Sequence, residues 1–231
     1  MTESTATSAY IDLYPEEVAG GMYHLLNGAI IPRPIAWVSS MSAEGVLNLA
    51  PHSYTTVLSP DPPIVCFVSI GVKDTLRNCA ATGEFVYNIG SEDLAQRLNM
   101  SAADFPPEIS EFEWSGLTPA ASDLVKPPRV GESPISFEAK VVDIQQIGQT
   151  QNYMIAGEIV RVHLAPWIMT DNRIDPEKLR PLARLAGSQF ARLGEVFAME
   201  RPRYQQLLAT GAKPIERQAH ETASRGQALR R

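Results

Sequence analysis

The sequence predicts a mainly β fold, an antiparallel barrel with peripheral α-helices. About seven segments have the composition and alternation of strands, against three or four short helical segments. The strands and helices do not alternate in the regular way that a doubly wound parallel sheet requires. Short turn-rich segments join several strand pairs instead, which is typical of antiparallel hairpins.

The composition is that of a globular protein with a sizeable core: 231 residues, 44% hydrophobic and 20% charged. A net charge of −6 argues against nucleic acid as a partner, because a phosphate backbone requires a basic face. No run approaches the roughly 18 apolar residues of a membrane span, and residues 1–17 lack the features of a secretory signal. We therefore expect a soluble, cytoplasmic protein.

In the first half of the chain, a helix is expected over residues 12–23, with Asp12 as its cap. The strands predicted next span residues 35–41, 46–50, 54–58, 64–70 and 85–89. Pro51 interrupts this pattern and therefore belongs at a strand end, a bulge or a sheet edge. Between the last two strands, Asp74 can cap a helix over 75–81 that Gly83 ends.

In the second half, a short helix after Ser91 leads into residues 101–129, a proline-rich excursion without periodicity. Loops of this length are usually functional or cover something. Residues 135–147 and 153–165 are predicted as a long hairpin. In the first of these strands Ser136, Glu138 and Lys140 alternate with apolar residues, which predicts one solvated face. A further helix is expected from Pro176 to about residue 193.

Several strong motifs are absent, namely GxGxxG, GxxxxGK[ST], GxSxG and HExxH. The four histidines do not pair at metal-ligand spacing, and the two cysteines form no CxxC, so no metal site is expected. Cys66 lies in an apolar strand, where cysteine usually behaves as a small buried hydrophobe. His163 is more often a structural histidine than a base at such a strand end.

Residues 69–75, SIGVKDT, form the first candidate binding site. A strand leads here through a glycine into a helix start with one lysine and two hydroxyls, and Arg77 adds charge from the first turn. Free backbone N–H groups at such a turn can hold an anion. The alternative is a plain capped helix, because Asp74 can satisfy the same N–H groups and would repel a phosphate.

Residues 48–54, NLAPHSY, form the second candidate site. Small residues beside a proline let a planar ligand lie against the backbone, and Ser53 can bond a ring edge. The alternative is a barrel corner in which Pro51 ends a strand.

Taken together, these segments resemble the flavin reductase-like family, whose fold is the FMN-binding split barrel. The resemblance covers residues 23 to 163 and rests on landmarks in the family's order and spacing. They are RPIAWVS (33–39), NLAP (48–51), Ser53, Pro62-Pro63, KDTLRN (73–78), TGEF (82–85) and Gly157-Glu158. The resemblance implies a homodimer that holds FMN in a cleft near the subunit interface, with FAD the less expected cofactor.

The resemblance also assigns roles to particular residues. Ser39 and Ser40 would flank the ribityl phosphate, while Asn48, Ala50, Pro51, His52 and Ser53 would border the isoalloxazine ring, and Ser69, Lys73, Asp74 and Thr75 would hold the phosphate end. Relatives more often carry an aromatic residue at position 52, so His52 is a candidate donor to the ring edge or to a substrate. No other side chain is expected to act in catalysis, because the cofactor carries the chemistry.

Three functions are compatible with this resemblance. The first is an NAD(P)H-dependent flavin reductase that supplies reduced flavin to a partner monooxygenase. The second keeps FMN bound and reduces an organic acceptor such as a nitroaromatic or a quinone. For that second function, Arg173, Arg180 and Arg184 suggest an anionic substrate, although a solvated helix face is the simplest interpretation of these arginines. The third is a flavin-binding carrier or sensor without turnover.

The sequence predicts four segments. Residues 1–22 form an N-terminal extension and residues 23–165 the split-barrel domain. Residues 166–210 form a helical segment that packs on the barrel or on the partner subunit, and residues 211–231 a flexible tail.

Overall fold

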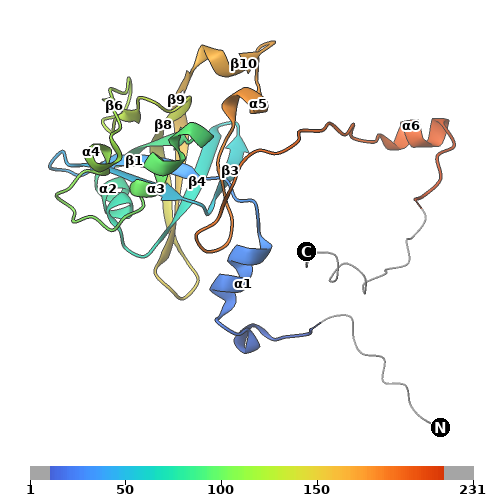
Figure 1. Cartoon of the computed structure of the whole chain (residues 1–231), viewed down its shortest axis with the longest axis horizontal. Helices are drawn as coiled ribbons and strands as arrows, with labels where there is room; N and C mark the ends of the chain where they lie inside the picture. The colour runs from blue at the N-terminus through green and yellow to red at the C-terminus, as the bar shows by residue number, and fades with distance from the viewer. Residues whose placement is uncertain (1–10, 216–231) are drawn as a thin grey trace, which may run out of the picture. The chain divides into compact units, whose positions relative to one another are not determined.

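A computed structural model describes residues 11–215 of the chain (Figure 1). The chain divides into two units, one comprising Tyr23–Glu195 and the other Met1–Met22 with Val196–Arg231. Most of the predicted tail, residues 216–231, and the first ten residues lie outside the described part. Within residues 11–215, no helix has the length and apolar character needed to cross a membrane.

A single antiparallel sheet of seven strands dominates the Tyr23–Glu195 unit, which confirms the predicted fold class. Its strand order is β2-β1-β5-β8-β9-β4-β3. The strands are β1 (Ala36–Met41), β2 (Leu47–His52), β3 (Thr55–Pro60), β4 (Pro63–Ile70), β5 (Glu84–Ile89), β8 (Ile135–Ile147) and β9 (Asn152–Leu164). Pro51 lies in β2, an edge strand, where its missing N–H breaks no ladder.

The two edges of the sheet approach each other without joining. Only Ser53 and Tyr54 separate β2 at one edge from β3 at the other. Next to the edge strand β3 lies β4, and we call the gap between β2 and β4 the seam. His52 crosses the seam, because its Nδ1 lies 3.3 Å from the Val68 carbonyl oxygen. The sheet is therefore a barrel with one open seam, and that opening is where a ligand can enter.

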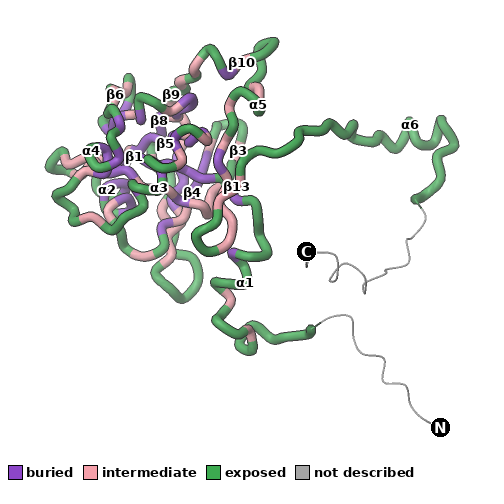
Figure 2. The backbone as a smooth tube through the Cα atoms, viewed as in Figure 1, coloured by how far each residue is buried: buried purple, intermediate pink, exposed green. Residues whose placement is uncertain are grey.

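Buried apolar residues pack on both faces of β1, the strand next to the edge strand β2, and Figure 2 draws the backbone around β1 in the purple of buried residues. Ala36 and Val38 point into a cluster with Phe67 and Phe85 inside the barrel. Trp37 points the other way, into a second cluster, and its Nε1 donates to Ser101 Oγ at 2.8 Å. The alternation of side chains along β1 thus builds both cores and fixes the position of the neighbouring strand β2.

The solvated face expected on β8 is wrong for two of its three polar residues. Ser136 and Glu138 are buried, and only Lys140 is exposed. The 101–129 excursion runs over this face, so that Glu138 accepts hydrogen bonds from the backbone N–H groups of Asp123 and Leu124 at 2.7 and 2.6 Å. The excursion also carries α4 (Glu111–Ser115), β6 (Pro119–Ala120) and, just beyond, β7 (Arg129–Val130).

Helix α2 (Asp74–Thr82) follows β4 and begins one residue earlier than expected. Its N-cap residue is Lys73, with no side-chain capping bond, so the prediction that Asp74 caps the helix is wrong. Asp74 lies in the first turn and pairs with Arg77 at 2.6 Å. Gly83 ends the helix at φ 70°, as expected. The short helix after Ser91 is also present, as η2 (Glu92–Leu94) and α3 (Ala95–Met100).

Two helix predictions near the ends of the chain are wrong. The expected helix over residues 12–23 is replaced by η1 (Pro15–Glu17) and α1 (Met22–Ala29), because Gly20 and Gly21 adopt φ values of 78° and 82° between them. The expected helix over residues 176–193 ends as α5 (Pro176–Leu179), because Pro181 cannot donate to a continuing helix.

Short elements occupy the rest of the 166–210 segment. They are η3 (Pro166–Ile168), β10 (Met169–Thr170), β11 (Arg173–Ile174), the hairpin β12 (Ala183–Arg184) and β13 (Phe190–Ala191), and α6 (Tyr204–Ala209). Leu182 is buried in the second core cluster, so residues 179–191 pack on the barrel by apolar contact as well as by backbone pairing. The compact unit accordingly extends to Glu195.

Candidate functional site

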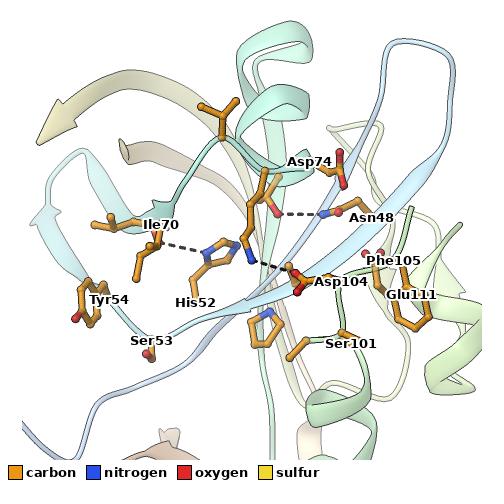
Figure 3. A pocket seen from close by; sticks show the side chains of 18 of the residues that line it. Asn48, His52, Ser53, Tyr54, Ile70, Asp74, Ser101, Asp104, Phe105 and Glu111 are labelled. Carbon is orange, nitrogen blue, oxygen red and sulfur yellow. Dashed lines mark hydrogen bonds and ion pairs between the residues drawn. The ribbon is translucent and has the colours of Figure 1, made fainter. Parts of the chain in front are cut away.

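A cleft of about 540 Å³ lies at the seam, between β2, the end of β4 and the start of α2. Eight of the eleven predicted cofactor residues line it: Asn48, Ala50, Pro51, His52, Ser53, Lys73, Asp74 and Thr75. Figure 3 shows His52 and Ser53 toward one end of the cleft and Asn48, Asp74 and Asp104 toward the other. The two candidate segments of the sequence therefore form one site.

The other three predicted residues do not line this cleft. Ser39, Ser40 and Ser69 are fully buried. Ser39 donates to the Pro128 carbonyl at 2.5 Å, and Ser69 donates to the Gly71 carbonyl at 2.9 Å. These hydroxyls hold loops and strands of the barrel in place, and their contact with a ligand stays a prediction.

Asn48 connects β2 to the start of α2. Its Nδ2 donates to Ser40 Oγ at 3.1 Å and, as Figure 3 shows, to Thr75 Oγ1, also at 3.1 Å. Side chains alternate along β2, so Asn48, Ala50 and His52 share the face that looks across the seam. Asn48 thereby fixes the distance between the strand and the helix N-terminus.

The N-terminus of α2 has the features of an anion site. Its first turn lacks a side-chain cap, which leaves backbone N–H groups free to face a ligand. Lys73 is exposed and its Nζ lies 3.3 Å from Asp104 Oδ1, while Arg77 compensates the charge of Asp74. Asp74 does not occupy those N–H groups, so the plain capped helix is not what the structure shows, and the anion cradle stays a prediction.

His52 is buried and held in one tautomer. A carbonyl oxygen only accepts hydrogen bonds, so Nδ1 carries the proton that it directs at Val68. Burial lowers the pKa of His52 to about 4 and outweighs the bond to Val68, with the nearby Lys73 charge lowering it further. The ring is therefore neutral at pH 7, and Nε2 presents a lone pair.

Nε2 of His52 is a buried polar atom with no hydrogen-bond partner among the described residues. Such atoms are rare in folded proteins, because an unmade hydrogen bond is costly in a dry environment. At this position a ligand N–H group would satisfy it. With the proton on Nδ1, as the contact to Val68 indicates, Nε2 is an acceptor, whereas the donor role expected for His52 requires the other tautomer and stays a prediction.

Several lining residues were not predicted individually. They are Tyr23, Tyr54, Val68, Ile70, Val72, Ser101, Ala102, Ala103, Asp104, Phe105 and Glu111, whereas Arg77, which also lines the cleft, is named in the sequence prediction. Five of them belong to residues 101–105, at the start of the excursion expected to cover the site. Glu111 accepts from the Leu49 N–H at 2.8 Å, and burial, its largest influence, raises the pKa of its carboxyl. Its sequence surroundings carry no signal for this contact.

His163 lies away from the cleft, where its Nε2 is 2.6 Å from Glu138 Oε1. Asp123, Glu138 and His163 bring potential ligand atoms within 4.8 Å of one another. Two backbone N–H groups already bond to Glu138, and Arg161 pairs with Asp123 at 2.9 Å. These contacts account for the cluster as a structural network.

The residues of the cleft fit a flavin. The uncapped helix start with Lys73 offers a place for a phosphate, and Ala50 and Pro51 offer little bulk against a planar ring. The neutral His52 offers an acceptor to a ring N–H. An isoalloxazine carries such an N–H group, so cofactor and site are chemically complementary.

A sequence model described as "Flavin reductase like domain" matches residues 28–172. Nitrilotriacetate monooxygenase component B from Bacillus cereus has a similar structure, with a TM-score of 0.80 and 37% identity over 84% of this chain and 100% of that one. For 2-nitrobenzoate 2-nitroreductase from Pseudomonas fluorescens the TM-score is 0.73, with 32% identity over 79% of this chain and 91% of that one.

A third solved structure, from Shewanella frigidimarina, contains a split barrel domain. It has a TM-score of 0.72 and 22% identity, and the match covers 78% of this chain and 91% of that one. At this identity the likeness concerns the fold alone. The seven-stranded sheet with its open seam is thus a split barrel.

Proposed function

This chain belongs to the flavin reductase-like domain family, and we propose that it is an FMN-dependent NAD(P)H oxidoreductase that supplies reduced flavin to a partner monooxygenase. The observation that carries the proposal is the cleft, where a buried unpaired His52 Nε2 and an uncapped α2 N-terminus are brought together. The monooxygenase partner is supported by the 37% identity to a protein named as component B of a monooxygenase.

In this proposal the two ends of the cleft hold different parts of FMN. Backbone N–H groups of α2, Lys73 and Thr75 bind the phosphate, while Arg77 limits the repulsion by Asp74. His52 Nε2 accepts a hydrogen bond from a ring N–H, and Ala50 and Pro51 lie along the ring. Bound FMN supplies the capacity to take a hydride from NADH or NADPH.

The chain's own contribution is binding and orientation. Asn48 keeps β2 at a fixed distance from α2, and the neutral His52 distinguishes the edge of the ring that carries a donor. Phe105 and the neighbouring residues border the cleft on the side of the excursion and limit access of water. None of these groups is required to transfer a proton.

We further propose a homodimer with the flavin near its interface. Ile70 and Val72 line the cleft and are 45% and 43% exposed, and the adjacent edge strand β3 exposes Val57 and Leu58. Exposed apolar side chains gathered beside a binding site are typical of an interaction surface. Sedimentation equilibrium would give twice the chain mass of 25.3 kDa, whereas a monomer at micromolar concentration would contradict this proposal.

The second candidate function keeps FMN bound and reduces an organic acceptor directly. It is supported by the 32% identity to a protein named as a nitroreductase. The two candidates differ in how the cofactor is used. A reductase for a partner enzyme exchanges its flavin freely, whereas a direct reductase retains it through each turnover.

Anaerobic titration of the FMN-loaded protein with NADH and with NADPH tests the proposal. Bleaching of the flavin band by one nucleotide establishes the oxidoreductase and names its donor. Steady-state oxidation of that nucleotide is then measured with excess free FMN and, separately, with 2-nitrobenzoate. Stimulation by free FMN alone supports the first function, and stimulation by nitrobenzoate alone supports the second. A flavin band that neither nucleotide bleaches contradicts both.

A further inference from the structure

A second hollow of about 600 Å³ adjoins the flavin cleft. Arg33, Arg184, Phe190 and Leu98 line it, and we call it the arginine hollow. It shares Pro51, Ser53 and Lys73 with the cleft, so the two cavities adjoin at these residues. Its volume is within the range of about 300–1,000 Å³ that is usual for small-molecule sites.

The arginine hollow has a one-sided charge. Its lining includes Arg33, Lys73 and Arg184, but no aspartate or glutamate. The chain as a whole has 26 acidic against 20 basic residues, so this local excess of cations departs from the rest of the molecule. The neighbouring flavin cleft, by contrast, contains Asp74, Asp104 and Glu111. A cavity lined by cations alone attracts anions.

Arg33 is buried, with 7% of its surface exposed, and no carboxylate of residues 11–215 pairs with it. Its guanidinium donates to the carbonyl oxygens of Asn27 at 2.7 Å, Ile30 at 2.9 Å and Leu185 at 2.8 Å, while its Nε has no partner among the described residues. Buried charges are normally paired with an opposite charge. The positive charge of Arg33 is therefore compensated only in part, by carbonyl dipoles.

Arg184 is held in position by the β12–β13 hairpin. Its guanidinium lies over the Phe190 ring, 4.6 Å from the centroid, and donates to the Gly187 carbonyl in the turn. The backbone of Arg184 pairs with that of Arg33, at 3.0 and 2.9 Å, which anchors the hairpin beside β1. Among residues 11–215, no ion pair involves Arg184. Its remaining N–H groups are available to a ligand.

Arg180, only four residues earlier, is in a different situation. It pairs with Glu92 at 2.6 Å and lies 3.8 Å from Asp93, and it does not line the hollow. The structure thus separates two arginines that the sequence groups together. Arg184 is positioned for a ligand, whereas Arg180 is already neutralised.

We propose that the arginine hollow binds a small organic acid, with its carboxylate at Arg184 and its aromatic or otherwise apolar body against Phe190 and Leu98. An arginine guanidinium presents a planar pair of donors that matches a carboxylate. The proposed acid site consists of protein residues only and does not require a bound flavin. Its use for the organic acceptor of the flavin rests on the proposed function.

Calorimetric titration with benzoate, and with benzamide as its uncharged analogue, tests this site. Benzoate binds the wild-type chain more tightly than benzamide. Arg184→Ala weakens benzoate binding about tenfold or more and leaves benzamide binding unchanged, because only the charged contact is lost. Arg180→Ala removes the same charge outside the hollow and leaves both affinities unchanged. Each titration is made with and without FMN.

Three results would overturn the proposal: no benzoate binding to the wild-type chain, equal affinities for benzoate and benzamide, or equal losses in Arg184→Ala and Arg180→Ala. A fourth is a loss of FMN affinity, but not of riboflavin affinity, in Arg184→Ala, which would assign the hollow to the cofactor's phosphate. If FMN fails to bind while benzoate discriminates between the two variants, the proposed function fails and the acid site stands.

Discussion

The imidazole Nδ1 of His52 lies 3.3 Å from the carbonyl oxygen of Val68, across the seam between β2 and β4. This contact does two things at once. It bridges the seam at a point where the strands do not pair, and it favours the tautomer in which the buried, unpartnered Nε2 is an acceptor. The His52 side chain therefore both connects two strands of the barrel and lines the proposed flavin site.

Replacing His52 by phenylalanine tests the acceptor role. Phenylalanine keeps an aromatic ring beside Phe67, whose ring centroid lies 4.7 Å from that of His52. It removes Nε2, so a ring N–H of bound FMN stays unpaired, at a cost of about 1–2 kcal/mol, or roughly tenfold in affinity. Fluorescence titration with FMN measures the change. An unchanged affinity in His52→Phe would contradict the role, and His24→Phe serves as the control outside this cleft.

The pH dependence of stability gives a second test of the buried neutral His52. Its pKa in the folded chain is about 4, against an ordinary value of 6.5. As pH falls below 6.5 the unfolded chain takes up this proton first, so stability declines until about pH 4, by about 3 kcal/mol in total. Urea unfolding between pH 7 and 4 measures this slope. His52→Phe flattens the slope, and a variant with the wild-type slope would show that His52 is not its source.

Glu138 is expected to be the carboxylate that contributes most to holding residues 101–129 against β8. Burial raises the pKa of its carboxyl, but hydrogen bonds from Asp123, His163 and Leu124 outweigh that effect and lower the pKa overall. The stabilisation is therefore present above the pKa of the unfolded glutamate and is lost as pH falls through the folded value. Glu138→Gln is expected to lower the free energy of unfolding at pH 7 by about 2 kcal/mol or more.

Equal stability of Glu138→Gln and the wild type at pH 7 would contradict this account of the network. Glu132→Gln is the matched control, because Glu132 bonds Thr118 in an exposed position. Loss of protection of the amides of Asp123 and Leu124 in hydrogen exchange would place the effect at the excursion.

Gly157 is required by packing. A Cβ at this position would meet the Phe85 ring, which is fully buried and packs edge-on against Phe67 with centroids 5.3 Å apart. Because the ring cannot move without disturbing the core, Gly157→Ala is expected to cost about 1–3 kcal/mol. Gly28→Ala meets nothing within 4 Å and is the control, expected to be neutral or slightly stabilising. Urea unfolding compares them, and equal midpoints would contradict this.

The sheet and most of the cleft residues could be predicted from the sequence, because strand alternation and polar residues at strand or helix ends are local patterns. Alternation located the strands, and the NLAPHSY and KDT segments each showed polar residues at strand or helix ends. The resemblance to a known family brought these segments together, and eight of their residues line one cavity. Residues 101–105 were predicted only as a covering segment, since nothing in their own pattern shows which strand they meet.

The errors on β8 have long-range causes, whereas those in the helices are local. Glu138 and Ser136 follow a solvated pattern, but Glu138 is bonded by the excursion 14 and 15 residues away, and Ser136 donates to Asn88 of β5, 48 residues away. Asp74 has the composition of a cap, yet it pairs with Arg77 in the first turn of α2. Arg180 and Arg184 differ because Glu92, 88 residues from Arg180, pairs with Arg180 and not with Arg184. Such contacts leave no periodic signal in the sequence.

The flavin site between α2 and His52 is tested most directly by comparing the binding of FMN and riboflavin. Fluorescence quenching measures both affinities in the wild-type chain and in Lys73→Met. If the α2 N-terminus holds the phosphate of a flavin whose ring lies beside His52, FMN saturates one site per chain and riboflavin binds about tenfold or more weakly. Lys73→Met then weakens FMN binding and leaves riboflavin binding unchanged, so the difference between the two affinities becomes smaller. Failure of both flavins to bind, or equal affinities for the two in the wild type, would contradict the account.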